Sequence, residues 1–458
     1  MQPLGYKGTT LDKKTLPDEI NSAMSIHLQN KADVQRLIGI FKGKQDIFSR
    51  ANDDKKRLVN NMIVINYANA FTRQIVGYTY PNGISYVQLQ SEYMQDVTKI
   101  NRFMKAEDKN TLDKIMADEQ SIFGTHYRAI LPDLIETDET PFEILKLSPY
   151  HTFIAYSTYN NRLPVYGCTY YPIKDKNGLT RFIYQIYTSN MCYVYNSASE
   201  NGITEDDFVS ETPHILKSVP IIEYPNNEFR IGDWEMAVGL FNAINNMASD
   251  SLNDVEQTVL SYLALFGVET PSEEDLNFMK KNRILVFNGA KGAVQNAKFI
   301  TAQIDGNSAN LLRTYLEDAL RVVVGIPDRN SAGGGDTGEA INAKNGWREI
   351  DVVAKNKTMF TEAAERKLLK IALQILSPKY ISDDLTVVDI DIKIPRNKND
   401  NLQTKTQSGS TLYKMGINKT DVAEIMDLTT DVEGFVKRWE EAEKEKSAKE
   451  DIDNFQCS

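Results

Sequence analysis

The chain has 458 residues, of which 41% are hydrophobic and 25% are charged. This composition excludes a largely disordered chain, a collagen-like fibre and a disulfide scaffold. The formal net charge of −11, from 52 basic and 63 acidic residues, excludes a protein that holds nucleic acid by overall attraction to its phosphates. No apolar run approaches the roughly 18 residues that a membrane helix needs, and the first residues contain no apolar stretch typical of a secretory signal.

The first 80 residues are expected to be mainly helical. Apolar residues recur at helical spacing over Leu28–Phe41, and a second amphipathic helix is expected over Leu58–Val76, which Gly77 would end. A strand follows from Ile84, and helical periodicity returns over 91–123.

The character of the chain changes to β-rich over 127–195. Short runs of Tyr, Ile, Val, Phe and Thr alternate with turn residues, a pattern that predicts a half-buried antiparallel sheet. The polar stretch 197–213 is expected to be a loop. A long helix is then expected over Asp233–Phe266, about 50 Å if it is fully helical, with Gly267 at its end.

A compact insertion follows over 268–305, with an expected helix over Ser272–Lys281 and expected strands over Ile284–Phe287 and Lys298–Thr301. The chain then returns along a helix over Ser308–Gly325. Arg313, Glu317 and Arg321 lie one turn apart on this helix, where they can form i,i+4 ion pairs. Its apolar side is expected to consist of Leu312, Tyr315, Leu316, Ala319, Leu320 and Val323.

A glycine-rich segment, 326–336, separates this return helix from another of up to about 40 residues that ends at Leu376. Gly333, Gly334 and Gly335 lack the Lys and Ser/Thr that a phosphate-binding loop requires. The interpretation is therefore a moving loop between two helices, since three glycines have an entropic cost that folding seldom tolerates without a use.

The remaining search for chemistry finds little. Asp389 and Asp391 alternate on an expected strand over Leu385–Ile394, where two carboxylates could hold metal ions; a soluble edge strand explains the same pattern. The four histidines are scattered, the three cysteines form no CxxC pair, and no nucleophile elbow is present. Neither an enzyme nor a bound cofactor or metal is expected. Few cysteines indicate a reducing compartment or indifference to redox.

Short helices are expected around 402–414 and 418–427, followed by a charged tail from Val432 that suits a solvated helix.

Six motifs follow one another along the chain in a characteristic order and spacing: Ile40–Ile47, Asn60–Tyr78, Ile122–Tyr127, Leu147–Tyr156, Val219–Asp233 and Asp336–Ala340. Through the order and spacing of these motifs, the chain resembles tailed-phage portal proteins, the head-to-tail connector rings. The resemblance is greatest to the branch typical of phages of Gram-positive hosts.

The resemblance implies an α+β portal-type fold with a mixed α/β wing, long stem helices, a small α/β clip, a long wing helix after a tunnel loop, and a helical C-terminal crown. The implied boundaries are wing 1–232 and 339–400, stem helices 233–266 and 306–325, clip 267–305, tunnel loop 326–338 and crown 401–458.

The resemblance also implies a function. Portal proteins form a homo-oligomeric ring, commonly of twelve subunits, at one capsid vertex. The ring passes double-stranded DNA during packaging and ejection, and it meets terminase, head-completion or adaptor proteins, and the major capsid and scaffolding proteins. The implied location is the virion, with the host cytoplasm during assembly and no membrane.

Two sets of residues are the candidates for contact with DNA in such a channel. The first is the tunnel loop, and the second is the stem row of Arg313, Glu317 and Arg321, for which an intersubunit salt-bridge network is the alternative. The tunnel-loop candidates are Asp328, Arg329, Asn330, Ser331, Gly333, Gly334 and Gly335. Competing interpretations of the whole chain are another virion ring or minor head protein, and a metal-dependent nuclease that uses Asp389 and Asp391.

Overall fold

The computed structural model describes residues 1–8, 10–52, 60–133, 140–159, 163–259, 262–268, 284–288, 296–300, 306–327, 347–396, 402–426, 432 and 434–444. The described residues form both helices and sheets, which confirms the expected α+β class. The chain divides into two compact units, the first made of Met1–Gln35, Thr72–Asp233 and Asp351–Ser458, and the second of Arg36–Phe71 and Trp234–Ile350.

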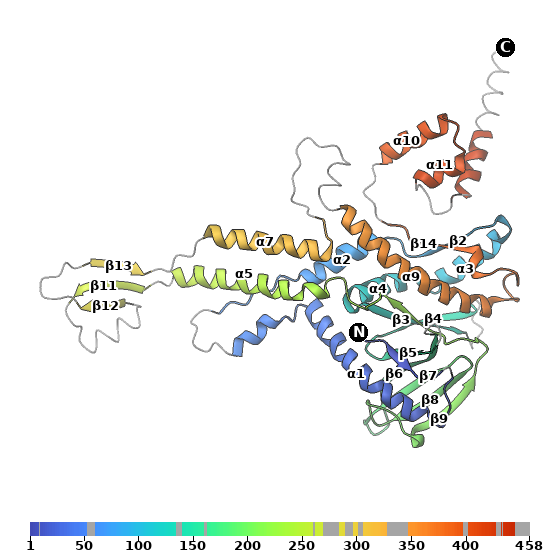
Figure 1. Cartoon of the computed structure of the whole chain (residues 1–458), viewed down its shortest axis with the longest axis horizontal. Coiled ribbons are helices and arrows are strands. Elements are labelled where there is room, and N and C mark those ends of the chain that lie inside the picture. Colours follow the sequence, from blue (N-terminus) through green and yellow to red (C-terminus); the bar gives the residue numbers. More distant parts are fainter. Residues whose placement is uncertain are drawn as a thin grey trace, which may run out of the picture. The chain divides into compact units, whose positions relative to one another are not determined.

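The largest sheet of the first unit has six strands in the order β1-β5-β6-β7-β8-β9. Neighbouring strands are antiparallel, except that β1 runs parallel to β5. Helix α1 (Leu16–Phe41) covers one face with Leu16, Ile20 and Met24, which are buried against the sheet (Figure 1). The strands are β1 (Leu4–Tyr6), β5 (Thr152–Ser157), β6 (Pro164–Lys174), β7 (Thr180–Tyr187), β8 (Met191–Ser197) and β9 (Phe208–Pro213).

Strand β9 corrects one expectation, because 197–213 is not all loop. Its six side chains are exposed, so the segment lacks the alternation of buried and exposed residues that marks a strand in a sequence. Pairing with β8 makes it a strand, and a short 3₁₀ turn, η4 (Glu205–Asp207), precedes it.

A second sheet has the order β10-β3-β4, and a third pairs β14 with β2. Together with helices α3, α4 and α9 they enclose the largest hydrophobic core of the unit. The expectation of a half-buried sheet is wrong for β3, where the first six residues are all buried. These elements are β2 (Ser85–Gln88), η2 (Ser91–Tyr93), α3 (Met94–Ala106), α4 (Lys109–Phe123), β3 (Thr125–Pro132), β4 (Phe142–Leu147), β10 (Ile221–Pro225), α9 (Trp347–Leu376), η6 (Val387–Asp389) and β14 (Ile390–Lys393).

The helical periodicity expected over 91–123 corresponds to two helices, α3 and α4. Asp108 has a positive φ of 50°, a left-handed conformation that interrupts an α-helix. Gly124 then ends α4 with a φ of 76°, and a Cβ there would lie 2.1 Å from the carbonyl oxygen of Arg230. Only glycine fits this junction.

Helices α5 (Val238–Val259) and α7 (Gly306–Val324) belong to the second unit and lie side by side (Figure 1). Between them along the chain is a three-stranded sheet in the order β12-β11-β13. Its strands are β11 (Tyr262–Val268), β12 (Ile284–Asn288) and β13 (Asn296–Ile300), and a 3₁₀ turn, η5 (Glu235–Ala237), precedes α5.

The helix expected over Asp233–Phe266 therefore ends seven residues early, at Val259. The run that follows it is the central strand β11, parallel to β12 and antiparallel to β13. A short apolar run fits a buried strand as well as a helix, and its pairing partners decide between them. The helix expected over Ser272–Lys281 lies outside the described residues.

The expected helix over Leu58–Val76 is also wrong in its first half. Helix α2 spans Tyr67–Thr79, passing Gly77, while residues 60–66 are neither helix nor strand. In that segment the backbone N–H groups of Asn61, Ile63 and Ile65 donate hydrogen bonds to side chains of α5.

The acceptors on α5 are Asn253 Oδ1 at 2.7 Å, Ser249 Oγ at 2.9 Å and Asn245 Oδ1 at 2.8 Å. They lie four residues apart on the helix, a rise of about 6.0 Å, which roughly matches the rise of two extended residues, about 6.6 Å. A row of polar side chains on a helix thus accepts the hydrogen bonds of every second backbone N–H group, as a neighbouring strand would in a sheet. The 3₁₀ helix η1 (Asp46–Asn52) also lies in this unit.

The two short helices expected near the C-terminus are confirmed as α10 (Leu402–Lys414) and α11 (Lys419–Met426). Within the described part of the tail, residues 434–444 are helical. The strand expected over Leu385–Ile394 is reduced to β14, because the 3₁₀ turn η6 occupies the residues before it.

Candidate functional site

The charged row of α7 acts electrostatically on Tyr67, the first residue of α2. Glu317 and Arg321 are half-buried and Arg313 is exposed. Burial raises the pKa of the Tyr67 hydroxyl; the charge of Glu317 raises it further, whereas Arg321 and Arg313 lower it. All three charges therefore lie near Tyr67, on the side of α7 that also buries Leu320 and Val324.

The opposite side of α7 is apolar and exposed. Leu311 is 76% exposed, Tyr315 68% and Val322 81%, and Leu312 and Val323 are half or more exposed. At 100° per residue, these five side chains fall within an arc of about 120°, hereafter the outer arc of α7. The apolar residues that the sequence placed on one side of this helix are thus divided between two sides: Leu320 is buried, and most of the others are exposed.

The glycine-rich segment stays a prediction. Residues 328–346 lie outside the described residues, and with them all seven tunnel-loop candidates from Asp328 to Gly335. The structure describes the chain up to Pro327 and again from Trp347, where α9 begins.

The two carboxylates proposed for metal each have another partner in the structure. Asp389 lies in the turn η6, where its carboxylate accepts hydrogen bonds from the Thr386 N–H at 3.0 Å and hydroxyl at 2.5 Å. Asp391, on β14, forms an ion pair with Lys393 at 2.7 Å. Within the described ranges no group of three or more His, Cys, Asp or Glu could hold a metal ion.

The histidines have structural surroundings. His126 is buried and lies 2.7 Å from Glu119, and burial of His27 lowers its pKa to about 4. Cys168 is buried, and burial raises the pKa of its thiol. A buried neutral imidazole and an inert thiol fit packing roles.

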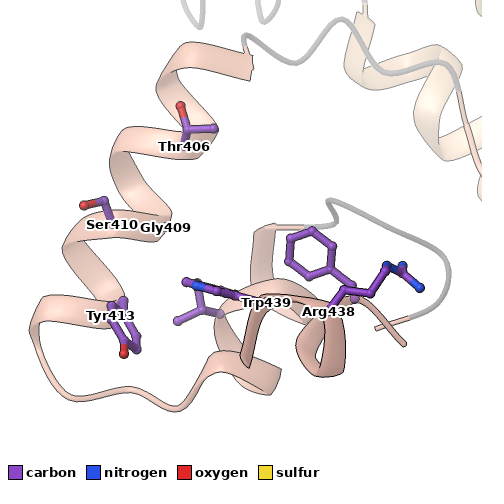
Figure 2. Close-up of a pocket in the computed structure, with 8 residues that line it drawn as sticks. Thr406, Gly409, Ser410, Tyr413, Arg438 and Trp439 are labelled. Atoms are coloured by element: carbon purple, nitrogen blue, oxygen red, sulfur yellow. The ribbon is translucent and has the colours of Figure 1, made fainter. Parts of the chain in front are cut away.

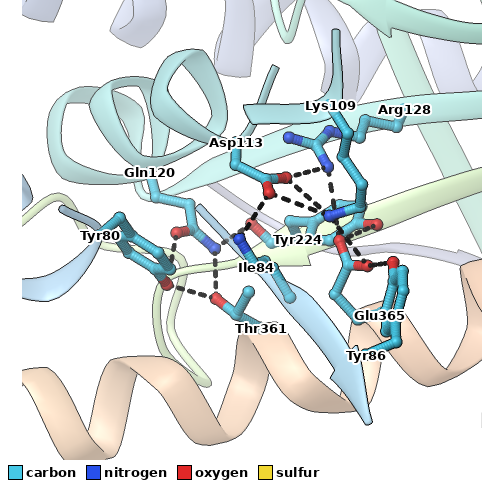
Figure 3. A network of polar contacts seen from close by, with 10 residues as sticks. All are labelled: Tyr80, Ile84, Tyr86, Lys109, Asp113, Gln120, Arg128, Tyr224, Thr361 and Glu365. Carbon is cyan, nitrogen blue, oxygen red and sulfur yellow. Dashed lines mark hydrogen bonds and ion pairs between the residues drawn. The ribbon is translucent and has the colours of Figure 1, made fainter. Parts of the chain in front are cut away.

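A buried network of charges was missed by the sequence analysis (Figure 3). Arg128 on β3 donates to Asp113 of α4 at 2.8 Å and lies 3.4 Å from Glu365 of α9. Lys109 donates to both oxygens of Asp113, at 2.9 and 3.0 Å, and lies 3.4 Å from Glu365. Two cations and two anions thus balance inside the core. The one signal in the sequence is an arginine in the middle of a β-rich run.

Asp113 and Arg128 favour each other's charged forms. Burial works to raise the pKa of Asp113, but Lys109 and Arg128 outweigh it and hold the pKa below its usual value. Burial likewise works to lower the pKa of Arg128, and Asp113, Tyr224 and Glu365 together raise it. Breaking such a set leaves a buried charge without its counter-ion.

The C-terminal helices enclose an apolar cavity of about 530 Å³ (Figure 2). The Trp439 ring lies 5.5 Å from that of Tyr413 and 6.0 Å from that of Phe435. Lys419 lies 5.5 Å from the Trp439 ring and forms an ion pair with Glu443. The other lining residues are Thr406, Gly409, Ser410, Val422 and Arg438. The cavity suits an apolar group.

Among the described helices, none is both long and apolar enough to cross a membrane.

Comparison with known proteins assigns the family. A search of curated proteins found no match. The sequence model of the family described as "Phage portal protein, SPP1 Gp6-like" matches residues 22–453, nearly the whole chain. This match confirms the resemblance found in the sequence. The chain therefore belongs to the SPP1 Gp6-like family of phage portal proteins.

Proposed function

We propose that this phage portal protein assembles as a ring of twelve identical subunits at one capsid vertex, with the pair α5 and α7 contributing to the contacts between neighbours. The observation that carries the ring contact is the outer arc of α7. Exposed apolar surface of this kind on a helix marks an interaction site. In a closed ring every subunit can cover the arc of its neighbour.

The region boundaries follow the same proposal. We assign wing to 1–232 and 339–400, stem to 233–266 and 306–325, clip to 267–305, tunnel loop to 326–338 and crown to 401–458. The adjacent helices α5 and α7, with a small sheet between them along the chain, support the order stem, clip, stem. The helices α10 and α11 support a helical crown.

The channel should hold DNA only weakly. A ring of twelve would carry a formal charge of about −132, twelve times −11, and such a field opposes tight binding of a polyanion. Every basic residue that neutralised a phosphate would add salt-dependent affinity and resist translocation. We propose that Asp328, Arg329, Asn330, Ser331 and Gly333–Gly335 approach the DNA.

The charged row on α7 is also assigned to the channel in this proposal. Arg313, Glu317 and Arg321 are proposed as alternating charges along the channel; their position near Tyr67 supports an additional contact within the subunit. The proposed partners are double-stranded DNA in transit, terminase, head-completion or adaptor proteins, and the major capsid and scaffolding proteins. The proposed site of assembly is the host cytoplasm, before the ring becomes part of the virion.

The test is negative-stain imaging with mass determination on purified protein. Wild type should form closed rings with a central channel. Leu311→Glu places a charge in the outer arc and should give subunits that do not close, because burying an unpaired charge at a contact is costly. Thr314→Glu is the matched control, since Thr314 is exposed on the polar side of the same helix. Rings of unchanged mass for Leu311→Glu would show that the arc is not a subunit contact.

A further inference from the structure

Helix α9 carries a buried polar stripe along the face that packs in the first unit. Lys357, Thr361 and Glu365 are spaced one turn apart and are 3%, 0% and 0% exposed. Lys and Glu are almost never fully buried unless they are paired. One turn further along, Leu369 continues the same line as an apolar core residue.

The first two residues of the stripe have different partners. The Lys357 ammonium donates to Asp233 at 2.9 Å. The Thr361 hydroxyl lies 2.7 Å from that of Tyr80 and accepts from the Gln120 amide at 3.2 Å (Figure 3). A cation therefore meets an anion, and a neutral group meets neutral groups.

Glu365 meets a third kind of site. Its carboxylate accepts from the hydroxyls of Tyr86 at 2.5 Å and Tyr224 at 3.0 Å, and it lies 3.4 Å from both Arg128 and Lys109. These four partners come from β2, β10, β3 and α4. The three positions of the stripe are chemically distinct, so they are not interchangeable.

If α9 moved along its axis by one turn, each of these side chains would face the partners of the residue one turn along the helix. Packed helices can slide past each other in steps of one turn, about 5.4 Å. A step toward the N-terminal end of α9 would place Leu369 against Arg128 and Lys109, leaving Asp113 as their one remaining counter-ion in the network. A step in the other direction would place Glu365 in the apolar site of Leu369.

We propose that Lys357, Thr361 and Glu365 act as a register lock, which holds α9 at one axial position against the sheets and helices of its unit. Apolar side chains alone permit a helix to slip by one turn, because similar side chains repeat at that interval. Polar pairs that differ in chemistry from turn to turn do not permit it.

A cross-linking experiment reads the register directly. Asp351 of α9 lies 2.8 Å from Arg396, so a short bifunctional thiol reagent should join Asp351→Cys to Arg396→Cys in the native register. After a slip of one turn toward the N-terminal end of α9, Lys355 takes the place of Asp351, and Lys355→Cys should then join Arg396→Cys. Both reporters are placed in the full chain with Cys192 and Cys457 replaced by serine.

The lock is opened with Glu365→Gln, which keeps the shape of the side chain, and with Lys357→Met. In each, the yield of the Lys355 reporter relative to the Asp351 reporter should rise about tenfold, as expected for loss of a hydrogen bond to a charged group. The controls Glu362→Gln and Lys367→Met, on less buried positions of α9, should leave the ratio unchanged.

The charge swap Asp233→Lys with Lys357→Asp should return the ratio toward that of wild type. An unchanged ratio in soluble, helical Glu365→Gln protein overturns the proposal, and so does a swap that fails to restore the ratio in protein that folds. The readout needs neither a ring nor DNA. Failure of the lock is therefore distinguishable from failure of the proposed portal assembly.

Discussion

Replacing Arg128 by Met should strongly destabilise the first unit. Methionine fills a similar volume, but the change removes the contact with Asp113 at 2.8 Å, that with Glu365 at 3.4 Å, and the position of the guanidinium over the Tyr224 ring at 5.1 Å. One cation, Lys109, then faces two buried carboxylates.

The expected loss in the free energy of unfolding is about 3 to 5 kcal/mol, as for removal of one partner of a buried ion pair. The lower end is favoured, because Arg128 Nε and Nη2 have no hydrogen-bond partner within the described part of the chain. On burial these two nitrogens therefore lose hydrogen bonds to water that no group in that part of the chain replaces, which lowers the net contribution of the arginine to stability. The measurement is urea unfolding at pH 7 followed by circular dichroism; a slope of about 3 kcal/mol/M would lower the midpoint by about 1 M or more.

A second variant tests whether charge balance is the reason. Arg128→Met with Asp113→Asn leaves Lys109 and Glu365 as one cation and one anion, and the amide oxygen can still accept the N–H of Ile84 at the position now occupied by the Asp113 carboxylate. The double variant should be more stable than Arg128→Met alone. If the two losses simply add, the argument from buried charge balance is refuted.

Two further predictions concern pH and the glycine-rich segment. Burial works to raise the pKa of Glu223, but the hydrogen bond and charge of Arg230 outweigh it and lower the pKa; the stability this supplies is present above the unfolded pKa of about 4.3 and is lost as pH falls through the folded value. The Glu223→Gln variant should therefore have a lower free energy of unfolding than wild type at pH 7, and it should lose less of that free energy when the pH falls to 4. Urea titrations at pH 7 and pH 4 measure both values. An equal loss in variant and wild type would contradict this prediction. Deletion of Ala332–Gly335 should leave ring assembly intact and impair DNA packaging or retention, with a four-serine replacement as the control for length; normal packaging and retention would count against the tunnel-loop assignment.

Sequence patterns predicted those elements whose signals are local. The short helices α10 and α11 and the strands β12 and β13 of the insertion occur close to the expected places, because periodicity and turn residues act over a few neighbours. Helix α1 contains the expected span Leu28–Phe41 but begins twelve residues earlier, at Leu16. The family resemblance also came from the sequence, through the order of motifs, and the match over 22–453 confirmed it.

Elements that depend on distant partners were not predictable in this way. Residues 60–66 have helical periodicity, yet Asn245, Ser249 and Asn253 hold their backbone extended from a distance of 180 residues or more along the chain. Likewise, Asp389 follows a strand-like pattern and lies in a turn, because the Thr386 hydroxyl and N–H bind its carboxylate.

The amino-acid sequence by itself determined the class of the protein, its family and the positions of the glycine-rich segment and the charged row on α7. Only the tertiary structure decided which side chains share a face or a core. Arg128 and Glu365 are 237 residues apart and lie 3.4 Å from each other, and the outer arc of α7 is distinguished from its buried side only by what packs against it. Periodicity is a property of one helix, whereas burial and charge balance are properties of every element that surrounds it.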